Sequence, residues 1–187
     1  IGGPAAFWCT PRDAEQLRRT LQLCRENGVR VYLLGNGSNT LFDDTGFDGA
    51  VIDMRGLSGM ENSGLDTDVV RITAGAGQTL GRLCSKAQTL GLTGLEFACG
   101  IPGTVGGAVY MNAGAYGACM ADVLESVRVY KPARQLDDGT RGSGNIIEFD
   151  ADELNLGYRK SRIADDGFIV LSATFNLAPG NAAMIKA

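Results

Sequence analysis

The chain has 187 residues, of which 44% are hydrophobic and 20% charged, and it carries a formal net charge of −4 and no histidine. These values are typical of a soluble globular protein with one core or two small subdomains. They argue against a general nucleic-acid partner, remove histidine-dependent catalysis and metal ligation within this chain, and leave no apolar run for a membrane span.

A helix is the first predicted element after the opening Ile1-Gly2-Gly3-Pro4-Ala5. Thr10 as N-cap, Pro11 at the first helical position and Gly28 as the stop predict a helix over residues 12–27. Its apolar face, spaced at three and four residues, consists of Ala14, Leu17, Leu21 and Cys24. We expect this face to pack against a sheet.

A strand predicted at residues 29–34 ends in Gly35-Asn36-Gly37-Ser38-Asn39. A loop rich in glycine, amides and hydroxyls at the carboxyl end of a strand offers N–H groups to phosphates. A hairpin turn is the ordinary alternative. A second strand is predicted at 50–54, and the first subdomain is expected to close near Arg55.

The second part of the chain is predicted to be mainly antiparallel strands with one helix. Its elements are a polar connection at 56–68, a strand at 69–74, a helix at 79–90 stopped by Gly91, strands at 125–130 and 146–149 flanking a hydrophilic hairpin or mobile loop at 134–145, and a strand at 168–177. In the last strand, alternation is expected to place five side chains on one face: Ile169, Leu171, Ala173, Phe175 and Leu177. The final residues are expected to begin a further helix.

Residues 98–117 are the most unusual stretch. Six glycines fall within it: Gly100, Gly103, Gly106, Gly107, Gly114 and Gly117. Such a pattern bares the main chain, so that its N–H groups can approach an anion or the edge of a flat ring. The ordinary alternative is a cluster of tight turns in a chain with 27 glycines.

The five cysteines are widely spaced and form no C-x-x-C pair, so neither a zinc site nor a disulfide framework is predicted. Buried thiols in a reducing cytoplasm are the expected state. Farther along, Tyr158-Arg159-Lys160-Ser161 places two cations between two hydroxyls after Gly157. Alone, this cluster is typical of a solvated strand edge.

Four segments in this order resemble the UDP-N-acetylenolpyruvoylglucosamine reductase (MurB) family of bacterial peptidoglycan synthesis. They are Ile1–Ala5, Gly35–Asn39, Gly100–Gly117 and Gly157–Ser161. The resemblance implies an α+β fold of the FAD-binding PCMH type, also called vanillyl-alcohol oxidase-like, in which FAD lies between two α+β subdomains. The implied divisions are subdomain 1 at 1–55, subdomain 2 at 56–180, and at 181–187 the start of a link to a substrate domain.

The resemblance also implies a set of site residues. Arg159 would be the catalytic, substrate-binding arginine and Tyr158 a substrate contact. The implied cofactor-binding residues are Gly35, Asn36, Gly37, Ser38, Asn39, Gly100, Ile101, Pro102, Gly103, Thr104, Gly106, Gly107, Asn112, Ala113, Gly114 and Ala115. With Gly106 in that set, Gly106→Val is expected to abolish FAD binding more than folding, because a β-branched side chain would block the cofactor.

The implied activity passes a hydride from NADPH to non-covalent FAD and then to the enolpyruvyl group of a UDP-sugar. No metal, nucleic acid or membrane span is implied, and the expected location is the cytoplasm. In the family, a third domain supplies a proton-donating serine and an assisting glutamate. We therefore expect this chain to be the FAD-binding part, inactive by itself.

Two alternatives stay open at this point. One is another flavin oxidoreductase of the same fold, of the sugar-lactone or alcohol oxidase type. Such enzymes often tether flavin through histidine, which this chain lacks. The other is a non-catalytic nucleotide-binding module.

Overall fold

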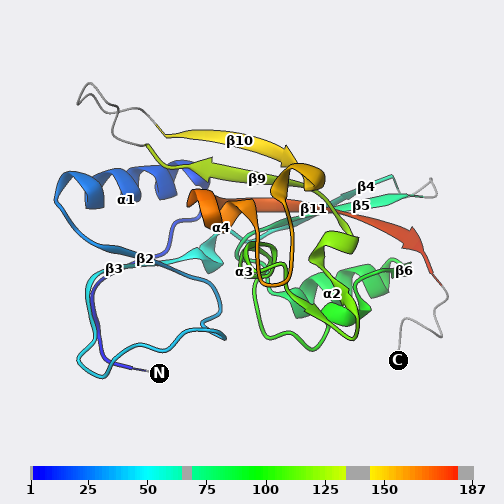
Figure 1. The fold of residues 1–187 in the computed structure, drawn as a ribbon, viewed down its shortest axis with the longest axis horizontal. Coiled ribbons are helices and arrows are strands. Elements are labelled where there is room, and N and C mark those ends of the chain that lie inside the picture. Colours follow the sequence, from blue (N-terminus) through cyan, green and yellow to red (C-terminus); the bar gives the residue numbers. More distant parts are fainter. Residues whose placement is uncertain (1, 65–68, 134–143, 181–187) are drawn as a thin grey trace.

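The computed structural model describes residues 2–64, 69–133 and 144–180, and shows two sheets with helices on their faces. The smaller sheet is parallel, in the order β1 (Ala5–Cys9), β3 (Phe47–Asp53), β2 (Val31–Leu34). Helix α1 (Ala14–Glu26) connects β1 to β2 (Figure 1). Because β2 and β3 run parallel, the loop Gly35–Asn39 after β2 is not a hairpin turn, and the hairpin alternative is excluded.

The larger sheet is antiparallel. Its order is β10 (Asn145–Asp150), β9 (Leu124–Lys131), β11 (Ile169–Pro179), β5 (Val70–Gly75), β4 (Met60–Ser63), and β6 (Leu92–Thr93) also pairs with β11. Strand β4 lies in the segment that was predicted to be only a connection. That prediction is wrong. The sequence Met-Glu-Asn-Ser has a low intrinsic strand propensity, and it forms a strand because it pairs with β5.

Short elements complete the larger lobe. They are α2 (Leu80–Thr89), α3 (Val105–Tyr110), α4 (Arg162–Asp166), the short strands β7 (Gly114–Ala115) and β8 (Ala118–Cys119), and 3-10 turns at Met54–Gly56, Glu96–Ala98, Met120–Asp122 and Ala151–Leu154. In Figure 1, α2 and α3 lie on the same side of the larger sheet. The predictions for 65–68, 134–143 and 181–187 lie outside the described residues.

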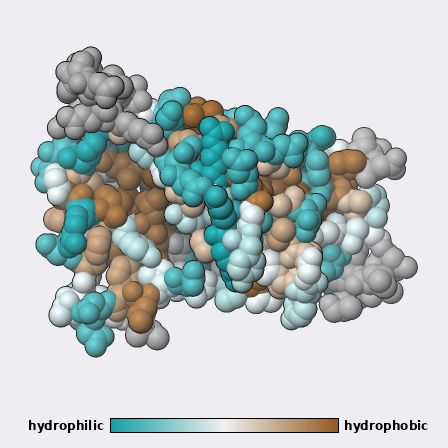
Figure 2. All heavy atoms as spheres, viewed as in Figure 1, coloured by the Kyte–Doolittle hydropathy of each residue, from teal (hydrophilic) through white to brown (hydrophobic). Residues whose placement is uncertain are grey.

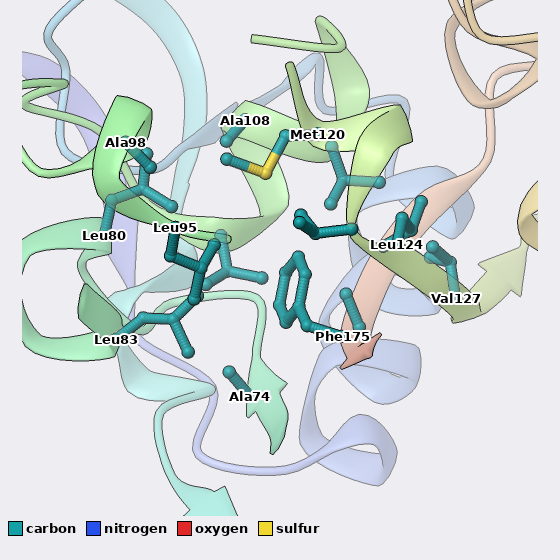
Figure 3. Close-up of a cluster of buried hydrophobic side chains, with 14 of the residues drawn as sticks. Ala74, Leu80, Leu83, Leu95, Ala98, Ala108, Met120, Leu124, Val127 and Phe175 are labelled. Atoms are coloured by element: carbon teal, nitrogen blue, oxygen red, sulfur yellow. The ribbon is translucent and has the colours of Figure 1, made fainter. Parts of the chain in front are cut away.

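A large hydrophobic cluster fills the space between the larger sheet and α2 and α3. Phe175 of β11 is fully buried at its centre, with Leu80 and Leu83 from α2 and Met120 (Figure 3). A second cluster joins the two sheets, because Leu17 of α1 and Ile52 of β3 pack with Tyr130 and Leu171 of the larger sheet. The loops at the carboxyl ends of the small sheet are thereby held beside the larger lobe.

Strand β11 changes face along its length. A register shift between Val170 and Ser172 places Ile169 and Leu171 in the inter-sheet cluster, whereas Ala173, Phe175 and Leu177 lie in the large cluster. The prediction of one continuous face is therefore wrong, because a bulge inserts one residue and reverses the alternation. All five side chains are nevertheless buried.

The start of α1 also differs from the prediction. Asp13, not Thr10, is the N-cap: its Oδ1 accepts a hydrogen bond from the Gln16 amide at 2.8 Å. Gln16 Oε1 in turn accepts from the Arg12 amide at 3.0 Å. The predicted stop is confirmed, since Gly28 adopts a φ of +66° just after the helix.

We expect Asp13→Ala to lower the free energy of unfolding by about 1 kcal/mol, because the Gln16 amide loses its acceptor. Thr10→Ala is the matched control and should leave that free energy nearly unchanged. Urea unfolding followed by circular dichroism measures both. Equal losses from the two variants would contradict Asp13 as the cap.

Candidate functional site

The two glycine-rich segments meet in space. Asn36 Nδ2 donates a hydrogen bond to the Pro102 carbonyl oxygen at 2.9 Å, across 66 positions of sequence. A Cβ placed on Gly35 would lie only 2.6 Å from Thr104 Oγ1, and one placed on Gly103 would lie 4.0 Å from Ser38 Oγ. We call this junction of Gly35–Asn39 with Gly100–Gly107 the seam.

The seam presents backbone donors that the protein does not use. The N–H groups of Asn36–Asn39, Gly100 and Gly107 have no acceptor among the residues that the structure describes, and all six residues are exposed. Free N–H groups on two adjoining segments favour a ligand with several anionic oxygens. No charged side chain is required, which fits a chain of net charge −4.

Thr104 lies between the two loops and is only 2% exposed. Its hydroxyl makes no hydrogen bond with any residue in the described part of the chain, and it lies where a Cβ on Gly35 or Gly107 would contact it. No fully buried side-chain oxygen or nitrogen of the described residues lacks a hydrogen-bond partner, so this hydroxyl oxygen still reaches the surface of the seam. A ligand oxygen in the seam would supply that partner.

Gly106 faces the protein interior. Its amide donates to the Ala76 carbonyl at 2.8 Å, and a Cβ there would lie 2.9 Å from Ala76 Cβ and 3.1 Å from Ala76 O. The small size of Gly106 therefore serves the packing of α3 on the chain after β5. The expectation that Gly106→Val would affect FAD binding more than folding has to be revised.

We expect Gly106→Val to destabilise the cofactor-free protein by at least about 2 kcal/mol through overpacking. Gly107→Val is the neighbouring control, because a Cβ there meets Thr104 Oγ1 at an ordinary 3.6 Å. Thermal melting of the two cofactor-free variants measures the difference. A Gly106→Val protein as stable as the wild type would contradict this packing role.

Helix α3 links the seam to a second group of predicted site residues. Thr104 is the N-cap of this helix, and the six residues of α3 span about 9 Å along the helix axis. At its other end, Asn112 Nδ2 donates to the Gly157 carbonyl at 3.0 Å, and Ser161 Oγ donates to the Tyr110 carbonyl at 2.6 Å. The structure thus brings the turn at 157–160 to the C-terminal end of α3.

Arg159 and Tyr158 lie at the tip of that turn, and Tyr158 is 94% exposed. The Arg159 guanidinium forms no ion pair or hydrogen bond with any described residue. A permanently charged planar group without a protein partner is available to an external carboxylate. The prediction of a plain strand edge here is replaced by an anchored turn.

The remaining predicted cofactor residues follow α3. Asn112 and Ala113 are buried, and both ends of the Asn112 amide are bonded to protein backbone, since Oδ1 accepts from the Ala121 amide at 3.0 Å. Gly114 and Ala115 form β7 and pair with β8. Sequence reasoning missed Ser161 as part of this arrangement, although its hydroxyl accepts from the Ala164 amide as the N-cap of α4, and serine is a residue typical of that position.

Two titratable side chains with shifted pKa values, Asp53 and Cys84, have structural roles. Burial raises the pKa of the Asp53 carboxyl, but hydrogen bonds from Arg55 outweigh this effect and hold the pKa below its usual value. Burial, together with the neighbouring Cys99 thiol, raises the pKa of Cys84 to about 12, so this thiol stays protonated. Within the described residues, no three His, Cys, Asp or Glu side chains are arranged to hold a metal ion.

The cysteines match the expectation only in part. Cys24 and Cys84 are buried, Cys9 and Cys119 are half-buried, and Cys99 is exposed beside Gly100. Among the described residues, none of the helices has the length and hydrophobicity that a membrane crossing requires.

Comparison with known proteins identifies relatives over the whole chain. A family of domains described as "FAD binding domain" matches residues 5–134. The UDP-N-acetylenolpyruvoylglucosamine reductase of Clostridium perfringens strain SM101 is 42% identical over 186 residues, and that of Clostridium beijerinckii is 44% identical over 188. The alignments cover 100% of this chain and 56% and 57% of those proteins, so the chain spans little more than half their length.

Solved structures agree with the fold. The crystal structure of UDP-N-acetylenolpyruvylglucosamine reductase (MurB) from Thermus caldophilus superposes with a TM-score of 0.72 at 34% identity, covering 100% of this chain and 60% of that one. A solvent-stable cholesterol oxidase superposes with a TM-score of 0.69 at 20% identity, and the superposition covers 92% of this chain and 34% of the oxidase chain. At this identity the likeness shows the shared fold alone. The resemblance to the reductase family and the predicted α+β, PCMH-type fold are confirmed.

The residues present fit FAD. Its diphosphate needs several donors on closely approaching backbone, which the free N–H groups of the seam provide. The space around Gly100 is open, since a Cβ there would meet no atom of the described residues within 4 Å, apart from its chain neighbours. The unpartnered Thr104 hydroxyl offers one further contact.

Proposed function

The chain belongs to the FAD binding domain family, and from that premise we propose that the seam holds the FAD diphosphate and that Arg159 binds the substrate. The proposed reaction is the NADPH-dependent reduction of the enolpyruvyl group of UDP-N-acetylglucosamine enolpyruvate to UDP-N-acetylmuramate, a step of peptidoglycan synthesis. The names of the Clostridium and Thermus relatives support this choice of reaction. The domain boundaries proposed with it are 1–55 and 56–180.

FAD, when bound, supplies the hydride transfer. The chain's own contribution to the cofactor begins with main-chain N–H groups from the loop after β2 and from the segment before α3. Hydrogen bonds to an anion are roughly twice as strong as neutral ones, so a few such contacts suffice without a lysine or arginine. Predicted contacts of Ile101, Pro102, Ala113 and Ala115 with the cofactor remain part of this proposal.

Arg159 acts on the substrate side. Hydride addition to an enolpyruvyl group moves negative charge toward its carboxylate, and a fixed cation there stabilises the transition state. The guanidinium presents a planar fork that binds a carboxylate through two hydrogen bonds and never loses its charge. Tyr158 is proposed to contact the same substrate from the neighbouring position of the turn.

The single observation that carries the proposal is the contact of the two glycine-rich segments through Asn36 and Pro102. It joins, in one seam, the free donors that a diphosphate needs. The cholesterol oxidase likeness favours no second function, because it extends to the fold alone. A histidyl-tethered flavin would have no attachment residue in this chain.

The test has two stages. First, the 187-residue chain is titrated with FAD, and the flavin absorption spectrum is expected to shift as the cofactor binds. Second, the chain is completed with the part of the C. beijerinckii reductase that the alignment leaves uncovered, and its flavin is reduced with NADPH. Reoxidation by UDP-N-acetylglucosamine enolpyruvate, but not by UDP-N-acetylglucosamine, is expected; failure to bind FAD would refute the proposal.

A further inference from the structure

The turn that carries Arg159 has an unusual conformation. Gly157 and Lys160 bond to each other in both directions, with N–H···O distances of 3.0 and 3.1 Å, which leaves Tyr158 and Arg159 at the tip. Arg159 has a φ of 55°, in the left-handed region that non-glycine residues seldom occupy. An exposed turn with such a residue persists only where surrounding contacts determine it.

Asn112 holds one side of this turn. Its Nδ2 donates to the Gly157 carbonyl and its Oδ1 accepts from the Ala121 amide, each at 3.0 Å, so both ends of the side-chain amide are fixed. Asn112 is 8% exposed and itself has a φ of 42°. Its backbone bond to Val109 makes it a direct continuation of α3.

Ser161 holds the other side. Its hydroxyl donates to the Tyr110 carbonyl at 2.6 Å and accepts from the Ala164 amide at 3.3 Å. Ser161 is fully buried. One hydroxyl therefore caps α4 and binds it to the last residue of α3.

We propose that Asn112 and Ser161 are positioning residues that set the location of Arg159 relative to the seam. They attach the chain immediately before and after the turn to one end of α3, while Thr104, the N-cap at the other end, lies in the seam. Two attachments flanking a short turn prevent it from swinging, which one alone would allow. This inference rests on the proposed function, because it assigns to Arg159 the binding of the substrate carboxylate.

The test uses the completed chain loaded with FAD, chemically reduced and mixed with UDP-N-acetylglucosamine enolpyruvate in a stopped-flow instrument. Asn112→Asp keeps the acceptor for Ala121 but loses the donor to Gly157, and Ser161→Ala loses the hydroxyl. Each variant is expected to slow flavin reoxidation by about tenfold to a hundredfold. Ser161→Thr, which keeps a hydroxyl, is expected to recover most of the rate, and FAD affinity should not change.

Two matched controls remove the same chemical groups elsewhere. Ser126→Ala deletes a buried hydroxyl that donates to Glu148 on the larger sheet, and Asn27→Asp removes the amide donor that bonds the Leu23 carbonyl at the end of α1. Both should leave the reoxidation rate unchanged. Their melting temperatures show how much of any rate loss accompanies simple destabilisation.

A double-variant cycle separates positioning from a structural role. In the Arg159→Ala background, Asn112→Asp and Ser161→Ala should cause no further loss of rate, because they act through Arg159. Equal losses in both backgrounds, or normal rates in the single variants, would overturn the inference while the proposed function stands. A normal rate for Arg159→Ala alone would overturn both.

Discussion

Arg159→Ala is expected to slow reduction of the enolpyruvyl substrate by about a hundredfold to a thousandfold while FAD stays bound. The turn at 157–160 holds the guanidinium in solvent without an ion pair or hydrogen bond to any described residue, so its removal takes away no contact that stabilises the fold. What is lost is the cation at the substrate carboxylate. Pre-steady-state reoxidation of the reduced flavin in the completed chain measures the effect directly.

Lys160→Ala is the control for this experiment. Lys160 is the next residue of the same turn, and its only described ion pair is a long one of 3.8 Å to Asp165, with its side chain 64% exposed. The variant removes the same formal charge from the same place. If Lys160→Ala slowed the reaction as much as Arg159→Ala, general electrostatic attraction would explain both, and the specific role of Arg159 would be refuted.

Gly100→Phe is expected to weaken FAD binding by about a hundredfold or more, close to 3 kcal/mol. In the described part of the chain, only the neighbours of Gly100 in sequence come within 4 Å of a Cβ placed on it, and its φ lies outside the left-handed range. The cofactor-free protein can therefore accept the side chain. The phenyl ring would then occupy space that the proposal assigns to the cofactor. Titration of the variant with FAD, followed by flavin fluorescence, gives the change in affinity.

Gly81→Phe provides the comparison. Gly81 is a glycine of α2 whose Cβ would also meet no described atom within 4 Å beyond its own helix, and it lies outside the proposed cofactor contacts. Both cofactor-free variants should melt near the wild-type temperature. Unchanged FAD affinity in Gly100→Phe would remove the 100–107 segment from the cofactor site.

Both longer helices and the longer strands of the larger sheet were predicted because their local signals agree with the packing. The helix predicted at 79–90 with Gly91 as its stop is α2 in the structure, which begins directly after Thr79, and Gly91 has a φ of +67°. Other features depend on contacts that no local pattern contains. The bulge in β11 arises from pairing with β9, and the β4 strand depends on pairing with β5.

Helix α3 was hidden by its composition. Val-Gly-Gly-Ala-Val-Tyr contains two glycines, which destabilise a helix by about 1 kcal/mol each, so no helix was predicted at residues 105–110. The helix persists because Val105 and Val109 are fully buried in the large cluster and Gly106 fits against Ala76. Tertiary packing outweighs propensity here.

The candidate site was predictable as residue types but not as an arrangement. The glycines of both segments and the arginine of the turn are visible in the sequence. Their arrangement depends on contacts across 66, 45 and 51 positions, made by Asn36, Asn112 and Ser161 respectively. Only the folded chain shows that α3 separates the seam from the Arg159 turn.

Hydrogen–deuterium exchange on the 187-residue chain, with and without FAD, tests most directly whether the segments 35–39 and 100–107 bind the cofactor together. The N–H groups of Asn36–Asn39, Gly100 and Gly107 have no described acceptor in the protein, so they should exchange rapidly without the cofactor. Saturating FAD should slow exchange in both segments together. Slowing in neither segment, or in only one of them, would contradict the proposal that the cofactor is held in the seam.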